Sequence, residues 1–145
     1  MRSWRSVGML GSLKKNSREA GVRLRSVLGR ETLLARRGGD EFIILLPEDT
    51  PPEEAALLAQ EICEKIALPV EIDGFRINTT ASIGVAVYPR DGVTAEALLK
   101  NADTAMYHAK ESGRNQFQYF SDELNRRTHE RVELDVALRE AINRG

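Results

Sequence analysis

Apolar residues along this chain repeat with two different periods, and each change of period marks an expected element. A spacing of three to four residues predicts amphipathic helices, whereas short apolar or alternating runs bounded by glycine and proline predict strands. The helical segments are residues 18–28, 51–66, 94–112 and 121–143, and the extended segments are residues 33–36, 41–46, 70–72, 75–77, 79–87 and 116–120.

Turn and cap residues support these boundaries. Gly38-Gly39 and Asp73-Gly74 each separate two extended runs, as in tight hairpin turns. Thr50 and Glu53 have the spacing of a capping box at the start of the second helix. Gly113 follows the third helix, where a left-handed residue is common.

The chain divides into three segments. Residues 1–17 lack a clear period and contain Gly8, Gly11 and four serines, so we expect them to be poorly ordered. Residues 18–120 form the domain proper, and residues 121–145 form a charged helix that we expect to project as a connector. The order of elements predicts an α/β (α+β) domain with a central, mostly antiparallel sheet flanked by helices.

Composition narrows the classes of protein. The chain has 145 residues, of which 41% are hydrophobic, so one domain with a sizeable core is expected. Because 21 Lys+Arg nearly cancel 22 Asp+Glu, no overall field attracts nucleic acid or an anionic membrane. No apolar run reaches the ~20 residues that span a bilayer. The single Cys63 lies on an apolar helix stripe, which indicates a buried small hydrophobe and fits the cytoplasm, either as this chain or as the cytoplasmic part of a larger protein.

The strongest chemical signal is Gly38-Gly39-Asp40-Glu41-Phe42 at the first hairpin. A tip without side chains lets a ligand approach the backbone, and two carboxylates directly after it can hold Mg²⁺ together with phosphate oxygens. The alternative is an ordinary hairpin whose acidic residues discourage edge aggregation.

Lys110 and Arg114 form the second candidate group, around the end of the third helix. Cations at this spacing can grip a phosphate, one as a point charge and one as a fork. The alternative is that they only complement the helix dipole. His108 and His129 have no acidic or cysteine partner at ligand spacing, and we interpret both as surface or structural residues.

Three blocks together resemble the GGDEF family. Residues 35–42 are similar to its signature hairpin, residues 80–86 to its later core strand, and residues 102–115 to its last helix and turn. The resemblance implies a diguanylate cyclase, in which two facing domains, a homodimer, each hold one GTP and join the two into cyclic di-GMP. It implies that Asp40 and Glu41 associate with Mg²⁺ (or Mn²⁺) and are catalytic, that Gly38 and Gly39 admit the nucleotide, and that Lys110 and Arg114 contact its phosphates.

The resemblance fails at the start of the chain. Family members begin with a strand ending in a metal-binding aspartate, followed by a segment that holds the guanine. By spacing, that aspartate falls before Met1 and the guanine-reading Asn and Asp fall near Arg5 and Lys14, so we expect the first strand to be missing. An Arg-x-x-Asp product-inhibition site would fall at Gly29 and Thr32, so such inhibition is not expected.

At the other end, residues 119–144 resemble the connector from GGDEF domains into EAL phosphodiesterase domains, which implies an EAL partner in the natural protein. Three hypotheses follow: a working or former cyclase, a degenerate GTP-binding regulator of a neighbouring domain, or a dimerising scaffold. Because the guanine contacts and one metal carboxylate are absent, the sequence favours little or no turnover.

Overall fold

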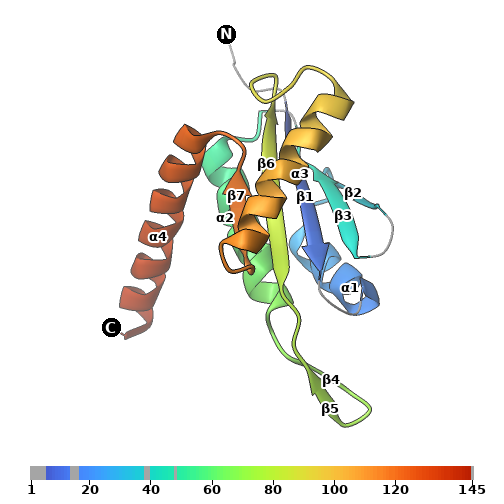
Figure 1. Cartoon of the computed structure of the whole chain (residues 1–145). Coiled ribbons are helices and arrows are strands. Elements are labelled where there is room, and N and C mark those ends of the chain that lie inside the picture. Colours follow the sequence, from blue (N-terminus) through green and yellow to red (C-terminus); the bar gives the residue numbers. More distant parts are fainter. Residues whose placement is uncertain (1–5, 14–16, 38–39, 48, 145) are drawn as a thin grey trace.

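The computed structural model describes residues 6–13, 17–37, 40–47 and 49–144 of the chain. Within these residues a five-stranded sheet has the order β2-β3-β1-β6-β7 (Figure 1). Neighbouring strands are antiparallel except β6 and β7, which are parallel, so the mostly antiparallel sheet expected from the sequence is confirmed. The strands are β1 (Ser6–Leu13), β2 (Leu33–Arg36), β3 (Glu41–Leu45), β6 (Ala81–Tyr88) and β7 (Gln116–Tyr119).

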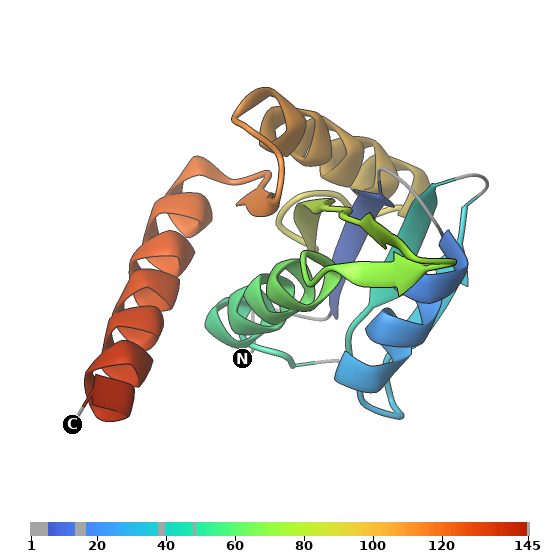
Figure 2. The same cartoon turned by 90° about the horizontal axis from the view of Figure 1, so that it is seen from below.

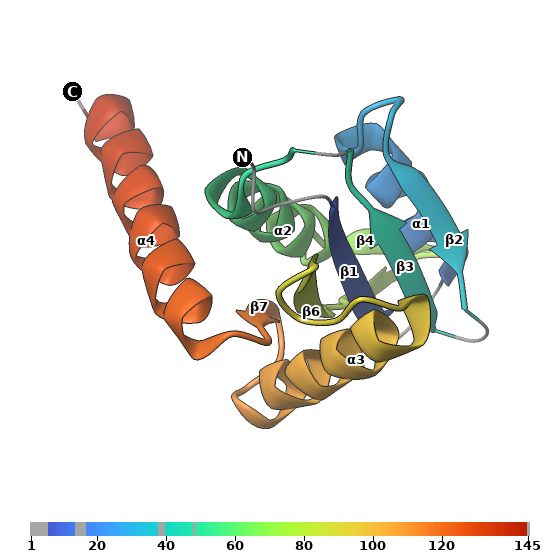
Figure 3. The same cartoon turned by 90° about the horizontal axis from the view of Figure 1, so that it is seen from above.

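Helices cover both faces of this sheet. One face carries α1 and α2, the other carries α3, and α4 lies beside α2 at the β7 end (Figure 2 and Figure 3). Each of the four helical segments predicted from the apolar period is present, with ends shifted by at most one residue. They are α1 (Ser17–Val27), α2 (Pro52–Ile66), α3 (Ala95–Glu111) and α4 (Asp122–Arg144).

Two buried clusters hold the layers together. The larger joins one face of the sheet to α1, α2 and α4, with Ile44, Ile83 and Phe117 at its centre. The smaller lies under α3 and contains Ala86 and Met106. Alternate residues of β6 point to the two clusters, and the strand is buried along nearly its whole length. It is therefore an interior strand of the sheet, paired with β1 on one side and β7 on the other.

The first strand is present, which corrects two expectations. Residues 6–13 form β1 between β3 and β6, so they are not a poorly ordered segment and the sheet does not lack this strand. The sequence Ser-Val-Gly-Met-Leu-Gly-Ser-Leu contains two glycines and no clear alternation, so its local strand signal is weak. Backbone hydrogen bonding to β3 on one side and β6 on the other stabilises β1 despite its low strand propensity. Residues 1–5 and 14–16 lie outside the described part.

Gly11 has a packing role in this strand. It stands opposite Phe42 of β3, and a Cβ at Gly11 would lie 2.1 Å from Cζ of the Phe42 ring. Any side chain at this position would displace the ring from the larger cluster. The glycine that weakened the strand signal is thus required by the core.

The predicted capping box of α2 is wrong. Pro51 is the N-terminal cap residue and makes no side-chain bond, while the Thr50 hydroxyl donates to the Pro47 carbonyl at 2.7 Å. Because that hydroxyl closes the preceding turn, it does not cap the helix. In α3, by contrast, Thr94 Oγ1 accepts a hydrogen bond from the backbone N–H of Ala97 at 3.1 Å.

A separate hairpin, β4 (Val70–Ile72) and β5 (Phe75–Ile77), extends away from the body of the domain (Figure 1). Its turn residues Asp73 and Gly74 both have positive φ, which confirms the Asp-Gly hairpin. The Arg23 guanidinium of α1 donates to the carbonyls of Lys65, Ile66, Leu68 and Pro69. One side chain therefore fixes the end of α2 and the base of the hairpin.

The first half of α4 is docked on the domain, so the expectation of a projecting connector is wrong there. Leu124, Thr128 and Val132 are buried, and Arg127 pairs with Glu53 of α2 at 2.8 Å. Three buried residues suffice because Leu124, Thr128 and Val132 lie on one side of the helix at a spacing of four. The second half exposes Leu134, Leu138 and Ile142.

Two side chains of α4 bond to the outer backbone edge of β7. The amide oxygen of Asn125 accepts from the N–H of Tyr119 at 2.9 Å, and His129 Nε2 lies 2.9 Å from the Phe117 carbonyl oxygen. The His129 ring also stacks on Phe117, with centroids 4.1 Å apart and planes at 2°. His129 thus has the structural role expected of it, while His108 is exposed.

Acidification is expected to destabilise the protein through His129. Burial lowers the pKa of this imidazole, against the opposing influence of the Phe117 carbonyl and Glu133. Because the pKa is lower in the folded than in the unfolded state, the unfolded state takes up the proton first. The stability that neutral His129 contributes is therefore complete above the ordinary value of 6.5 and is lost as the pH falls below it through the folded-state pKa. Urea unfolding at about pH 7.5 and about pH 5.5 measures this loss.

His129→Gln should reduce the loss of unfolding free energy on acidification, because the titrating group is gone. The matched control is His108→Gln on α3, whose exposed side chain makes no comparable contact with β7, and this variant should keep the parent's pH dependence. An unchanged acid loss in His129→Gln would assign the effect to other groups.

Cys63 is buried on the inner side of α2, as predicted, and burial raises the pKa of its thiol to about 12. Such a thiol is inert at neutral pH. Among the described residues, no helix has both the length and the apolar character needed to cross a bilayer.

Candidate nucleotide site

The two candidate carboxylates lie where the β2–β3 hairpin re-enters the sheet. Glu41 is the first residue of β3, and its carbonyl accepts a hydrogen bond from the N–H of Arg37 at 2.9 Å, which closes the hairpin. Asp40 is exposed and Glu41 is half-buried. Gly38 and Gly39, predicted to form the side-chain-free tip, lie outside the described residues.

Strand register relates Glu41 to the other end of the candidate site. Glu41 pairs with Ser12, Ser12 with Ser82, and Ser82 with Gln116, so these residues form one row across β3, β1, β6 and β7. With strands ~4.8 Å apart, three steps cover about 14 Å. Because Arg114 precedes Gln116 by only two residues, both candidate pairs belong to the same end of the sheet.

Side-chain alternation sets the face on which Glu41 lies. Phe42 and Ile44 point into the larger cluster, on the α1 and α2 side. Ile43 packs instead on the cluster beneath α3. Successive strand residues alternate between faces, so Glu41 shares the face of Ile43. The carboxylate and the helix that carries Lys110 are thus on the same side of the sheet.

The C-terminal cap of α3 holds Lys110 and Arg114. The N–H of Arg114 donates to the Ala109 carbonyl at 2.9 Å and the N–H of Gly113 to the Lys110 carbonyl at 3.4 Å, the paired bonds of a Schellman motif. Gly113 has φ +115, a backbone conformation that favours glycine. Arg114 lies beyond the helix, so the cap and not helical spacing brings the two cations to one turn.

Two carboxylates fit a magnesium–triphosphate but not a site made of protein ligands alone. Among the described residues, no three His, Cys, Asp or Glu side chains are grouped so as to hold a metal ion. Mg²⁺ takes one or two carboxylates and completes its shell with phosphate oxygens and water, so Asp40 and Glu41 match its needs when a nucleotide is present. The partner of Glu41 on β1 is Ser12, and β1 contains no acidic residue.

The start of the domain differs from its expected position. Residues 14–16, between β1 and α1, lie outside the described residues. Spacing placed the first strand before Met1, but residues 6–13 form it, so the expected position was wrong. This strand contains no aspartate, as expected. Arg5 and Lys14 lie outside the described residues.

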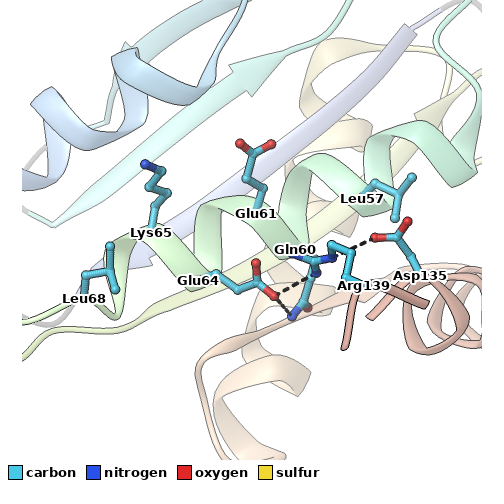
Figure 4. A pocket seen from close by; sticks show the side chains of 8 residues that line it. All are labelled: Leu57, Gln60, Glu61, Glu64, Lys65, Leu68, Asp135 and Arg139. Atoms are coloured by element: carbon cyan, nitrogen blue, oxygen red, sulfur yellow. Dashed lines mark hydrogen bonds and ion pairs between the residues drawn. The ribbon is translucent and has the colours of Figure 1, made fainter. Parts of the chain in front are cut away.

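A groove elsewhere on the surface contains none of the candidate residues. It lies between α2 and α4, has a volume of about 440 Å³, and is crossed by Arg139, which pairs with Glu64 and Asp135, each at 3.3 Å (Figure 4). The groove is on the α2 side of the sheet, whereas Glu41 is on the α3 side. It is therefore unrelated to the candidate nucleotide site.

Comparison with known proteins places the chain in a family. The family model described as "Diguanylate cyclase, GGDEF domain" matches residues 18–116. The chain belongs to the GGDEF family, and the resemblance found in the sequence is confirmed.

Individual relatives have different named activities. The chain is 40% identical over 126 residues to the bifunctional diguanylate cyclase/cyclic di-GMP phosphodiesterase MucR of Pseudomonas aeruginosa, covering 87% of this chain and 18% of MucR. It is 38% identical to the cyclic di-GMP phosphodiesterase PdeR of Escherichia coli, covering 86% of this chain and 19% of PdeR. The chain thus spans less than a fifth of the length of these relatives.

Solved structures agree with the fold. The GGDEF domain of TpbB (YfiN) from Pseudomonas aeruginosa superimposes with a TM-score of 0.74 at 30% identity, covering 80% of this chain and 82% of that one. An EAL/GGDEF domain protein from M. capsulatus gives a TM-score of 0.73 at 36% identity, covering 81% and 85%. The α+β class and the GGDEF fold are therefore established.

Proposed function

We propose that this chain is a diguanylate cyclase-type signalling domain that binds the magnesium-bound phosphates of GTP but turns the nucleotide over slowly or not at all. The supporting observation is the row across the sheet, which puts Glu41 and the Lys110–Arg114 cap at one end and on one side. Lys110 and Arg114 would grip the phosphates, and Gly38 and Gly39 would let the nucleotide approach.

Asp40 and Glu41 would hold the metal ion, Mg²⁺ or Mn²⁺. When bound, that ion polarises phosphate oxygens and lowers the pKa of the attacking hydroxyl. Asp40, the more exposed carboxylate, is the better placed to help activate that hydroxyl. A complete reaction would need a second copy of the domain carrying the other GTP.

Weak turnover follows from what the chain lacks. β1 contains no acidic residue, and the family resemblance places its guanine-reading Asn and Asp near Arg5 and Lys14, which cannot replace them. A site that loses hydrogen-bond partners for its ligand loses both affinity and positioning. We therefore expect the chain to keep affinity for the phosphates while losing its selectivity for guanine over other bases.

A second candidate is a GTP-binding or dimerising module that regulates a neighbouring EAL phosphodiesterase domain. The observation in its favour is that relatives of similar identity are named as phosphodiesterases, or as bifunctional proteins, over much longer chains. GTP binding without cyclic di-GMP formation would support the regulator. Self-association without measurable GTP affinity would support a scaffold.

Alanine at Lys110 or Arg114 is expected to weaken GTP binding in the presence of Mg²⁺ by about tenfold or more, because each variant removes a charge-assisted bond to phosphate. Calorimetric titration of the purified chain measures the affinity, and chromatography of the products measures cyclic di-GMP. Lys100→Ala, an exposed lysine on the same helix, is the matched control and should bind like the parent.

Two results would contradict the proposal. Equal GTP affinity in the parent, Lys110→Ala and Arg114→Ala would remove both residues from the site. Sustained cyclic di-GMP production by the 145-residue chain would refute the expected loss of turnover.

A further inference from the structure

A series of hydrogen-bonded side-chain amides runs along β7 from α4 to the turn that carries Arg114. The series consists of Asn125, Gln118 and Gln116, each half-buried. On β7 the aromatic residues Phe117 and Tyr119 point into the larger cluster, so the two glutamines between and before them point to the α3 side. This is the side on which the candidate phosphate-binding turn lies.

Gln116 holds that turn directly. Its Nε2 donates to the Ser112 carbonyl at 2.9 Å and to the Arg114 carbonyl at 3.3 Å. Ser112 is the C-terminal cap residue of α3, where backbone oxygens have no partner within the helix, and Arg114 lies in the turn that follows. The Gln116 amide therefore links the cap residue Ser112 to Arg114 itself.

The backbone that Gln116 braces is a strained one. Arg114 has φ 62 and Asn115 has φ 51, both in the left-handed region that costs a residue with a side chain about 1 kcal/mol or more. Two consecutive residues persist in this region only where surrounding bonds fix them. Bonds to carbonyls on both sides of Gly113 supply that constraint.

The remaining amides connect Gln116 to α4. Gln118 Nε2 donates to Gln116 Oε1 at 2.7 Å, and Asn125 Nδ2 donates to Gln118 Oε1. Asn125 is itself fixed, because its Oδ1 accepts from the N–H of Tyr119. Every amide in the series has a consistent donor and acceptor, so the orientation of each is determined by its neighbours.

We propose that Gln116 is a positioning residue for Arg114, and that Gln118 and Asn125 extend this link to α4. This inference rests on the proposed function, since it assigns Gln116 a part in holding the phosphate-gripping arginine. Without Gln116 the left-handed turn relaxes, and Arg114 spends less time directed at the bound phosphates. The docked position of α4 then affects nucleotide affinity through three side chains.

The test measures GTP affinity with Mg²⁺ by calorimetry for the whole chain. Gln116→Ala should weaken binding about three- to tenfold, the net value of a lost hydrogen bond pair. Gln116→Glu keeps the size of the side chain but loses the donor, so it should weaken binding as much as alanine does. Gln118→Ala should weaken it less, in the same direction.

The double variant Gln116→Ala/Arg114→Ala separates positioning from general damage. If Gln116 acts through Arg114, the double variant binds GTP no more weakly than Arg114→Ala alone. The matched control is Gln60→Ala on α2, whose amide bonds to Glu64 in the groove of Figure 4, and it should bind like the parent.

The possible outcomes distinguish the two proposals. If Arg114→Ala binds GTP like the parent, the proposed function of the site fails. If Arg114→Ala weakens binding while Gln116→Ala and Gln116→Glu do not, the positioning role is refuted. An equal further loss in the double variant also refutes it, because it shows a general structural effect. Parent-like binding by Gln118→Ala would refute the link to α4.

Discussion

Gly84→Ala is expected to destabilise the domain by more than about 3 kcal/mol, beyond the usual cost of adding one methyl group to a core. Gly84 is the point where β6 passes beneath α3. A Cβ there would lie 2.0 Å from the Ala102 carbonyl oxygen and 2.3 Å from the backbone nitrogen of Met106. These are backbone atoms, so the whole helix must move away, and the cluster beneath it opens.

Urea or thermal unfolding checks this expectation, with Gly21→Ala as the control. Gly21 lies within α1, and a Cβ there would meet no atom within 4 Å outside its own helical turn. The same substitution at Gly21 should stabilise the protein by about 0.5–1 kcal/mol, because alanine restricts the unfolded chain and favours a helix. A Gly84→Ala protein as stable as the parent would show that α3 does not pack on β6 at this distance.

Phe117→Ala is expected to cost about 3–5 kcal/mol, the range for deleting a fully buried aromatic side chain. Phe117 is 1% exposed, stacks on His129, and meets the Tyr119 ring edge-to-face with centroids 5.9 Å apart. Its loss leaves a cavity at the junction of β7, α2 and α4. We expect α4 to loosen together with the loss of stability.

Denaturant unfolding and amide hydrogen exchange in α4 measure the two effects. The matched control is Phe75→Ala on the β4–β5 hairpin, where the ring is 72% exposed and its removal should change the unfolding free energy little. Equal losses in the two variants would contradict the role assigned to Phe117. Unchanged exchange in α4 would show that the helix is held by other contacts.

The sequence predicted the elements with strong local signals and missed those that depend on their neighbours. All four helices of the described chain, both hairpins and β6 follow from apolar spacing and turn residues. β1 did not, because its glycines lower strand propensity, while the role of Gly11, which leaves space for Phe42, appears only after β3 pairs with β1. The docking of α4 was missed because its buried side, Leu124, Thr128 and Val132, includes a polar residue, while the apolar Leu134, Leu138 and Ile142 are exposed.

The residues of the candidate site that belong to short sequence motifs could be predicted. Asp40 and Glu41 follow from the hairpin signature, and Lys110 and Arg114 from the block around Gly113. Gln116 carried no signal, since an amide in a short strand is ordinary until register and the helix cap bring it to the Arg114 carbonyl. Positioning residues of this kind depend on three-dimensional contacts.

The bonds that α4 makes to β7 have a consequence for association. Asn125 and His129 are bonded to the Tyr119 N–H and the Phe117 carbonyl. An additional strand would need these two backbone groups to pair with β7. While α4 stays in place, the sheet cannot grow past β7. Growth by strand addition is left to the opposite margin, where β2 has a neighbour on one side alone among the described strands.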